Sequence, residues 1–192
     1  MKIDIIIAGV GGQGIVSIAA AIGLAAVEAN LHIKQSEVHG MSQRGGEVQS
    51  HLRISDTEIA SDLIPEGKAD MIISVEPMEA LRYIPMLNDS GWVITNANPY
   101  INISNYPDIN VVYKEIKTFK NHLIIDADKI AKDLGSDKAA NMVILGAAAP
   151  HLNIDYKIIE NAVKSLFSRK GEEIVNMNLS ALNAGKQFVR TN

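Results

Sequence analysis

A buried strand followed by a glycine turn and an apolar helix constrains the fold of this chain more than any other stretch. Residues 3–8, IDIIIA, form a nearly continuous apolar run rich in β-branched side chains, which is typical of a strand buried on both faces of a parallel sheet. The glycine-rich residues 9–14, GVGGQG, come next. Residues 13–29 are apolar on nearly every side and predict a helix that packs closely on the sheet. This order of elements predicts an α/β domain.

The strand–helix alternation continues along the chain. We expect further strands at residues 31–35, 47–54, 71–75, 92–96, 111–116 and 123–127, and helices at 77–87, 128–135, 137–150, 156–167 and 172–189. Residues 47–54 alternate strictly, which indicates a half-exposed strand, and residues 55–61 could turn it into a hairpin. The prediction is a single domain, residues 1–192, with a Rossmann-like, mainly parallel sheet, helices on both faces and a β-hairpin insertion after the second strand.

Composition excludes several classes of function. The chain has 192 residues, a net charge of −4 and no cysteine, so disulfides, a cysteine nucleophile and iron–sulfur clusters ligated by cysteines of this chain are excluded. Its five histidines show no metal-ligand spacing, and we expect no metal site. The absence of a basic block argues against nucleic acid. The most apolar run, residues 15–27, is shorter than the ~20 residues that span a bilayer. We therefore expect no membrane partner and a cytoplasmic location.

The glycine turn has two open interpretations. Gly9, Gly11 and Gly14 satisfy G-x-G-x-x-G between a strand and a helix, and the helix N-terminus behind them favours anions. The acidic residue that binds the ribose of NAD should end the second strand, but that strand ends in residues 34–36, KQS, and Glu37 falls late. Tight strand–helix packing and an anion site are equally consistent with the pattern, whereas NAD is disfavoured. The candidate anion-site residues are Gly9, Gly11, Gly12, Gln13 and Gly14.

A second unusual segment is SEVHGMSQRGGEVQSHLRI, residues 36–54. Its polar side chains and glycine breaks predict that residues 36–46 form a loop near the glycine turn that contacts a binding partner. Arg44 is the strongest candidate, because a guanidinium pairs with a carboxylate or phosphate; the alternative is a salt bridge to Glu37 or Glu47. Ser42 has no evident catalytic base, so a nucleophilic role is disfavoured. The candidate partner-site residues are His39, Ser42, Gln43 and Arg44.

At this point the chain resembles a known family, the small (beta or gamma) subunits of the thiamine-diphosphate-dependent 2-oxoacid:ferredoxin oxidoreductases. The resemblance is carried by GVGGQGIV at 9–16, residues 36–54, ADMIISVEPMEALRY at 69–83, NMVILGA at 141–147 and NLSALNAG at 178–185. It is greatest to the branch of the family that acts on indolepyruvate. The segments span most of the chain in the expected order.

The resemblance implies oxidative decarboxylation of a 2-oxoacid to an acyl-CoA, with electrons passed to ferredoxin. Thiamine diphosphate, magnesium, 4Fe–4S clusters and coenzyme A are then expected on a larger partner subunit, through which ferredoxin also binds, and this chain alone is expected to be inactive. The resemblance implies indolepyruvate or another aryl pyruvate as substrate. The alternatives are a gamma subunit of a pyruvate or branched-chain 2-oxoacid enzyme, and an independent nucleotide- or anion-binding domain.

Overall fold

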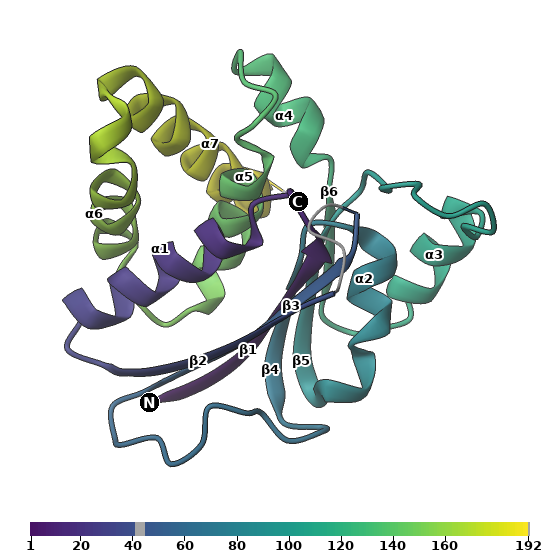
Figure 1. Cartoon of the computed structure of the whole chain (residues 1–192), viewed down its shortest axis with the longest axis horizontal. Coiled ribbons are helices and arrows are strands. Elements are labelled where there is room, and N and C mark those ends of the chain that lie inside the picture. Colours follow the sequence, from purple (N-terminus) through teal and green to yellow (C-terminus); the bar gives the residue numbers. More distant parts are fainter. Residues whose placement is uncertain (41–44, 192) are drawn as a thin grey trace.

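The central layer of the protein is a mixed β-sheet. The computed structural model describes residues 1–40 and 45–191, and in this part of the chain six strands follow the order β2-β3-β1-β4-β5-β6 (Figure 1). Strands β1, β4, β5 and β6 are parallel, whereas β3 is antiparallel to both of its neighbours. Strand β1 has a neighbour on each side, so the apolar run at residues 3–8 lies in the interior of the sheet. The strands are β1 (Lys2–Val10), β2 (His32–His39), β3 (Glu47–Ser55), β4 (Ala69–Ser74), β5 (Leu87–Asn96) and β6 (His122–Ile125).

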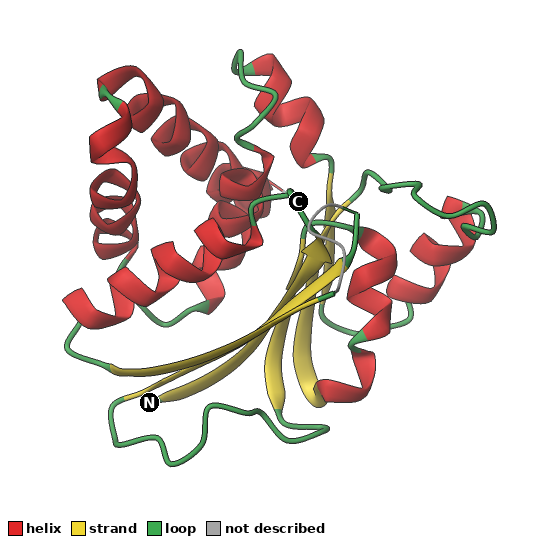
Figure 2. Ribbon diagram, in the orientation of Figure 1, coloured by secondary structure: helices red, strands yellow, loops and turns green. Residues whose placement is uncertain are grey.

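Helices cover both faces of the sheet, as the sequence predicts. Figure 2 shows α1, α5, α6 and α7 on one side and α2 and α3 on the other. The helices are α1 (Ile15–Glu28), α2 (Pro77–Arg82), α3 (Ile109–Ile116), α4 (Ala127–Asp133), α5 (Ala140–Ala148), α6 (Tyr156–Phe167) and α7 (Glu172–Thr191). No helix within residues 1–40 and 45–191 is both long and apolar enough to cross a bilayer.

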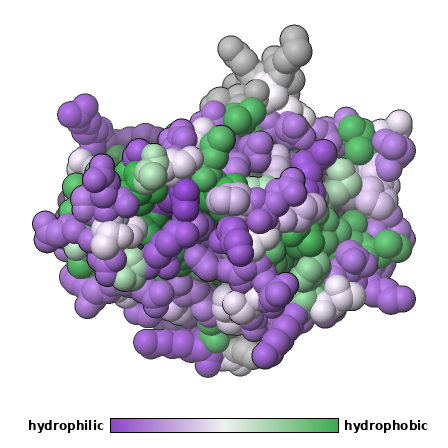
Figure 3. All heavy atoms as spheres, turned by 90° about the horizontal axis from the view of Figure 1, so that it is seen from below, coloured by the Kyte–Doolittle hydropathy of each residue, from purple (hydrophilic) through white to green (hydrophobic). Residues whose placement is uncertain are grey.

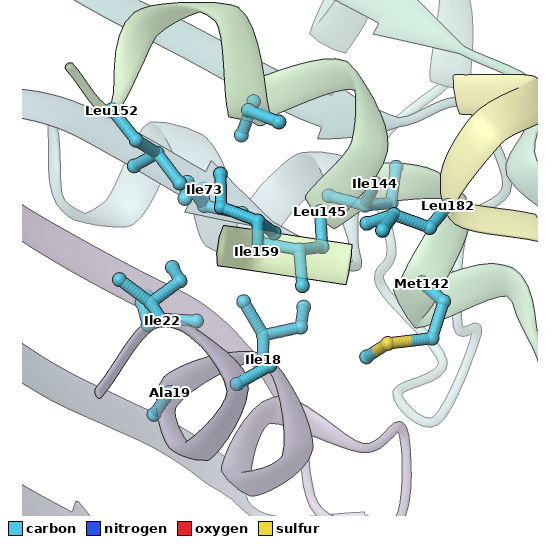
Figure 4. Close-up of a cluster of buried hydrophobic side chains, with 14 of the residues drawn as sticks. Ile18, Ala19, Ile22, Ile73, Met142, Ile144, Leu145, Leu152, Ile159 and Leu182 are labelled. Carbon is cyan, nitrogen blue, oxygen red and sulfur yellow. The ribbon is translucent and has the colours of Figure 1, made fainter. Parts of the chain in front are cut away.

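The two-residue period of β1 divides the core into two clusters. Ile5 and Ile7 pack with the cluster that includes α1 and α5, whereas Ile6 and Ala8 pack with the cluster beneath α2 and α3. Successive side chains of a strand point to opposite faces, so the apolar run at residues 3–8 is buried on both sides. The close-up shows the larger cluster, in which side chains of α1, β4, α5, α6 and α7 meet (Figure 4).

Helices α5 and α7 cross without any side chain between them at one point. A Cβ atom on Gly146 would lie 1.9 Å from the backbone oxygen of Leu182, and one on Gly185 would lie 1.9 Å from the backbone oxygen of Val143. Both positions therefore require glycine. They fall in NMVILGA and NLSALNAG, two of the segments on which the family resemblance rests.

Two local predictions were wrong. Residues 111–116 belong to helix α3 and not to a strand, because Val112 and Ile116 are buried at helical spacing while Val111 is 62% exposed. The predicted hairpin partner at residues 55–61 is also not a strand. The hairpin is formed by β2 and β3 themselves, and the segment after β3 is held by Arg53, whose Nη1 donates to the carbonyl oxygens of Ser61 and Leu63 at 3.1 and 2.9 Å.

Candidate functional site

The glycine turn joins β1 to α1 at the carboxyl edge of the sheet. Its shape is fixed by Gln13, whose backbone N–H donates to the carbonyl oxygen of Val10 at 3.1 Å and whose Oε1 accepts from the Val10 N–H at 2.8 Å. Gly14 is the N-cap of α1, has a φ of 82°, and offers no side chain to cap the helix. The helix N-terminus therefore opens directly onto this edge.

The individual glycines have different physical roles. A Cβ on Gly9 would lie 2.3 Å from Cγ2 of Val75, and one on Gly14 would lie 2.4 Å from Nδ2 of Asn141. Gly12 has a φ of +102° and nothing within 4 Å of its Cβ position. Gly9 and Gly14 thus support the packing interpretation of the motif, whereas Gly12 faces open space.

A crevice of about 390 Å³ lies beside the turn. It opens at the carboxyl ends of β1 and β4. The chain leaves β1 for α1 on one face of the sheet and leaves β4 for α2 on the opposite face, and ligands of open α/β sheets usually bind at such a point. Asn96 fixes one wall, because its Nδ2 donates to Asp128 at 2.8 Å and its Oδ1 accepts from the Ala127 N–H at 3.1 Å. The charged residues lining the crevice are Asp128, Asp137 and Lys138.

The crevice does not have the geometry of a dinucleotide site. In that fold the second strand lies next to the first and supplies the acid for the ribose. Here β3 lies between β1 and β2, so Glu37 on β2 is two strand spacings, about 10 Å, from β1. The order of the strands therefore explains why no acidic residue ends the second strand beside the glycine turn, and it argues against an NAD site.

The segment at residues 36–46 meets the glycine turn through its backbone. The N–H of Gly11 donates to the carbonyl oxygen of Gly46 at 2.8 Å, and the N–H of Gly45 donates to the carbonyl oxygen of Gly11 at 3.5 Å. The predicted boundary was wrong, because Ser36–His39 continue β2 in register with β3. The loop is therefore shorter than predicted and begins at Gly40.

All four candidate partner-site side chains lie outside the described part of the chain. Ser42, Gln43 and Arg44 lie outside the described residues, and so does the side chain of His39. Of the two carboxylates weighed as salt-bridge partners of Arg44, Glu47 pairs with Nη1 of Arg82 at 3.3 Å, and Glu37 accepts from Nε2 of Gln35 at 3.3 Å. The role of Arg44 therefore stays a prediction.

Glu76 is the buried acid of this edge. It follows β4 and caps α2, as its position before Pro77 indicates, and it is only 1% exposed. Its Oε2 accepts from the Glu79 N–H at 2.8 Å, and its Oε1 accepts from the Tyr100 N–H at 3.3 Å and from the hydroxyl of Tyr106. Burial and the hydrogen bond to Glu76 raise the pKa of Tyr106 far above its usual value. The carboxylate thus joins α2 to the segment between β5 and α3.

The segment at residues 97–108 adds residues that the sequence analysis did not single out. Its length, asparagines and prolines were its only signal for function. Asn102 reaches the loop after β2, since its Nδ2 donates to the carbonyl oxygen of Gly45 at 2.6 Å. Tyr106 binds Glu76, as described above. These contacts join segments that lie far apart in the sequence, so no local pattern predicts them.

Arg82 and His51 hold the elements around this edge in place. Arg82 contacts Glu79 at 2.9 Å in addition to Glu47 on β3. The pKa of Glu79 is raised because it is buried, and the contact with Arg82 opposes that effect. His51 is buried, its Nδ1 accepts from the Ile64 N–H at 3.1 Å, and burial lowers its pKa. His51 is thus a hydrogen-bonding sheet residue.

The iron–sulfur clusters and the magnesium expected from the resemblance lack their usual ligands in the described part of this chain. The sequence has no cysteine to ligate an iron–sulfur cluster. Among residues 1–40 and 45–191, no group of three or more acidic or histidine side chains is arranged to hold a metal ion such as the magnesium of thiamine diphosphate. Together the fold and this edge define an α/β domain whose glycine turn is hydrogen-bonded to the residues that precede β3.

Comparison with known proteins assigns this domain to a family. The family model described as pyruvate ferredoxin/flavodoxin oxidoreductase matches residues 4–188. The chain is 37% identical to indolepyruvate oxidoreductase subunit IorB of Archaeoglobus fulgidus over 96% of this chain and 94% of the relative. It is similar to the keto/oxoacid ferredoxin oxidoreductase gamma subunit of Geobacter sulfurreducens PCA, with a TM-score of 0.72, 24% identity and 99% of each chain covered.

A longer chain contains the same fold. The 2-oxoglutarate:ferredoxin oxidoreductase of Magnetococcus marinus, a structure with 2-oxoglutarate, coenzyme A and succinyl-CoA bound, matches with a TM-score of 0.78 and 22% identity. The match covers 100% of this chain and 31% of that one, so this chain spans about a third of its length. The protein described here belongs to the pyruvate ferredoxin/flavodoxin oxidoreductase family, and the resemblance to small subunits that the sequence indicates is confirmed.

Proposed function

We propose that this chain is the small subunit of a 2-oxoacid:ferredoxin oxidoreductase that acts on indolepyruvate or another aryl pyruvate. The observation that carries the proposal is the 37% identity to an indolepyruvate oxidoreductase subunit over nearly the whole of both chains. In the reaction the carboxyl group of the 2-oxoacid leaves as carbon dioxide, the acyl group is transferred to the thiol of coenzyme A, and two electrons pass to ferredoxin.

The larger subunit supplies the chemistry in this proposal. Thiamine diphosphate, magnesium, the 4Fe–4S clusters and coenzyme A are held by that subunit, which is also the route to ferredoxin. The clusters in particular need cysteine ligands, and this chain has no cysteine. The 192 residues act as one gamma-type domain in the cytoplasm, without nucleic-acid or membrane partners. The role of the chain is to complete the active site of the larger subunit.

The contact that completes the site is proposed to be the loop after β2. Its last residues are tied to the glycine turn by the hydrogen bonds between Gly11 and Gly46 and between Gly45 and Gly11, at the edge where α/β domains bind ligands. Arg44 is the proposed anion contact, assisted by His39, Ser42 and Gln43. Gly9, Gly11, Gly12, Gln13 and Gly14 form the proposed anion-binding turn beneath it, with Gly12 on the open side.

Purification of the complex tests the proposal. A tagged chain should co-purify with a longer polypeptide that contains thiamine diphosphate and iron, and the complex should reduce ferredoxin with indolepyruvate and coenzyme A. The isolated chain should show no turnover. If the complex prefers pyruvate or branched-chain 2-oxoacids, the chain is instead the gamma subunit of an enzyme that acts on those substrates. Turnover by the isolated chain would contradict the proposal.

The same preparation tests the second candidate, an independent nucleotide- or anion-binding domain. The observation that favours it is the crevice of about 390 Å³ at the switch point of the sheet. Tight binding of NAD or a flavin by the isolated chain, measured by calorimetry, would support it. Binding of neither, together with a stable complex, would leave the subunit role.

Variants of Arg44 test the loop. If the guanidinium of Arg44 forms a desolvated ion pair, we expect Arg44→Ala to lower kcat/KM or subunit affinity by at least 30-fold. Arg44→Lys should recover only part of this loss, since lysine keeps the charge but lacks the planar guanidinium that forms two parallel hydrogen bonds. Rates, KM values and assembly all within twofold of the wild-type protein would show that the loop is not a functional contact.

A further inference from the structure

A second surface loop lies against the one after β2. Residues 97–108 run from the end of β5 to α3 without regular secondary structure (Figure 1). Within them, Tyr100 is 43% exposed, Ile101 71% and Ile103 41%. Exposed large apolar side chains that are grouped on one loop indicate an interaction site.

This loop is held in one conformation by a buried charge. Glu76 is 1% exposed, and removing a carboxylate from water costs several kcal/mol unless donors replace the lost hydration. Two of its donors, the Tyr100 N–H and the Tyr106 hydroxyl, come from the loop. At the start of the loop, the hydroxyl of Tyr113 donates to the carbonyl oxygen of Ala97. The apolar side chains are therefore presented on a fixed backbone, which reduces the entropy lost on binding.

The loop encloses a hollow that suits apolar groups. The hollow has a volume of about 310 Å³, and its walls include Pro99, Ile101, Ile103, Pro107 and Ile109. Among the described residues that line it, Asp108 carries the only charge, and its Oδ1 accepts from the Asn110 N–H at 2.7 Å at the start of α3. An anionic small molecule would find no counter-charge there, whereas an apolar side chain of a protein partner would be buried.

Residues 97–108 contact the loop that we propose to face the larger subunit. Asn102 donates to the carbonyl oxygen of Gly45 at 2.6 Å, so the two loops are joined directly. Arg82 also connects the two regions. It pairs with Glu47, which follows the first loop, and with Glu79 on α2, three residues after Glu76. A partner that covers residues 40–46 would therefore reach residues 97–108 as well.

We propose that residues 97–108 form a second docking surface for the larger subunit, into which that subunit inserts an apolar side chain, and that Glu76 and Tyr106 are positioning residues for it. This inference rests on the proposed function. The Magnetococcus fold match supports the choice of occupant, because there the same fold is about a third of a longer polypeptide and the remainder belongs to the same chain. Figure 3, which views one face of the protein, shows hydrophobic residues gathered in more than one patch among hydrophilic ones.

The test uses the purified larger subunit and three variants of this chain. Ile101→Ser removes an exposed apolar side chain from the hollow. Tyr106→Phe removes one hydroxyl and leaves Glu76 its bonds to the Glu79 and Tyr100 N–H groups. Val27→Ser is the matched control, because Val27 is 61% exposed but lies on α1, away from this edge. Circular dichroism and thermal unfolding confirm that each variant is folded.

We expect Ile101→Ser to weaken association with the larger subunit at least 10-fold, Tyr106→Phe about 5-fold, and Val27→Ser less than twofold. Hydrogen exchange of the amides of residues 100–106 should slow on complex formation. In the free chain, Tyr106→Phe should speed exchange in this segment alone, which a general loss of stability would not do.

Other outcomes overturn the inference. If Ile101→Ser and Tyr106→Phe bind within twofold of the wild-type chain, the loop is not a contact, although the proposed function stands. An equal loss with Val27→Ser would show that the effect is not specific to this surface. If the wild-type chain itself forms no complex with a larger, iron-containing subunit, the proposed function fails first, and the inference fails with it.

Discussion

Replacing Gly146 by alanine adds one methyl group where α5 crosses α7. That carbon would lie 1.9 Å from the backbone oxygen of Leu182 and 2.8 Å from its carbonyl carbon, whereas unstrained heavy-atom contacts are about 3.5 Å. The helices must move apart by roughly 1.5 Å, because a backbone carbonyl cannot rotate away as a side chain can. We place the cost near the upper end of the usual range for overpacking, about 3 kcal/mol.

Alanine also has an intrinsic advantage in a helix, worth about 1 kcal/mol over glycine. The expected net loss in the free energy of unfolding is therefore about 2 kcal/mol. The matched control is Gly23→Ala in α1, where the added Cβ would contact only Cδ1 of Ile33, at 3.0 Å. That atom is the end of a flexible side chain, so we expect a change between zero and a gain of about 1 kcal/mol.

Urea unfolding followed by circular dichroism measures both variants. With a slope near 2 kcal/mol per molar urea, the midpoint should fall by about 1 M for Gly146→Ala and should stay or rise for Gly23→Ala. The reasoning is refuted if Gly146→Ala unfolds at the same or a higher urea concentration than Gly23→Ala with an unchanged slope.

Three further predictions concern buried polar groups. The hydroxyl of Tyr156 is buried and has no hydrogen-bond partner within residues 1–40 and 45–191, so Tyr156→Phe should stabilise the fold by about 1 kcal/mol in thermal unfolding; a loss of stability would contradict this. Burial raises the pKa of Tyr83 from 10.0 to about 12, so the unfolded chain loses this proton first. Stability should then fall as the pH rises from 10 to 12, by up to about 3 kcal/mol, and Tyr83→Phe should lessen the fall; an identical alkaline profile would refute the link. Asp4 is 1% exposed and accepts from Arg53 at 2.8 and 3.1 Å, so Asp4→Asn should cost about 3 kcal/mol by leaving that guanidinium poorly paired, and a loss below 1 kcal/mol in urea unfolding would show that the ion pair contributes little.

The buried strands and the glycine turn were predictable because their signals are local. A β-branched run such as residues 3–8 is buried on both faces, and its burial needs no knowledge of distant segments. Residues 111–116 misled the prediction for the opposite reason. Their β-branched side chains suggest a strand, but Asp108 caps a helix there and Val112 and Ile116 contact the second core cluster. Tertiary packing overrides a weak intrinsic preference.

The candidate site was less predictable because distant segments build it. The proximity of the glycine turn to the loop after β2 was predicted correctly, and backbone bonds between Gly11 and Gly46 support it. Nothing local, however, indicates that Asn102 reaches Gly45 or that Tyr106 reaches Glu76. These pairs are separated by 57 and 30 residues, and their partners are chosen by the fold.

The antiparallel strand β3 accounts for two features of this edge together. By pairing with β1 along its whole length, from Lys2 with Ser55 to Val10 with Glu47, it occupies the place that the acid-bearing second strand has in a dinucleotide-binding domain. The same pairing carries the start of β3 to the end of β1, so Gly45 and Gly46, which precede β3, meet the glycine turn at Gly11. The topology therefore favours a domain whose glycine turn supports a protein loop, and it weighs against independent nucleotide binding.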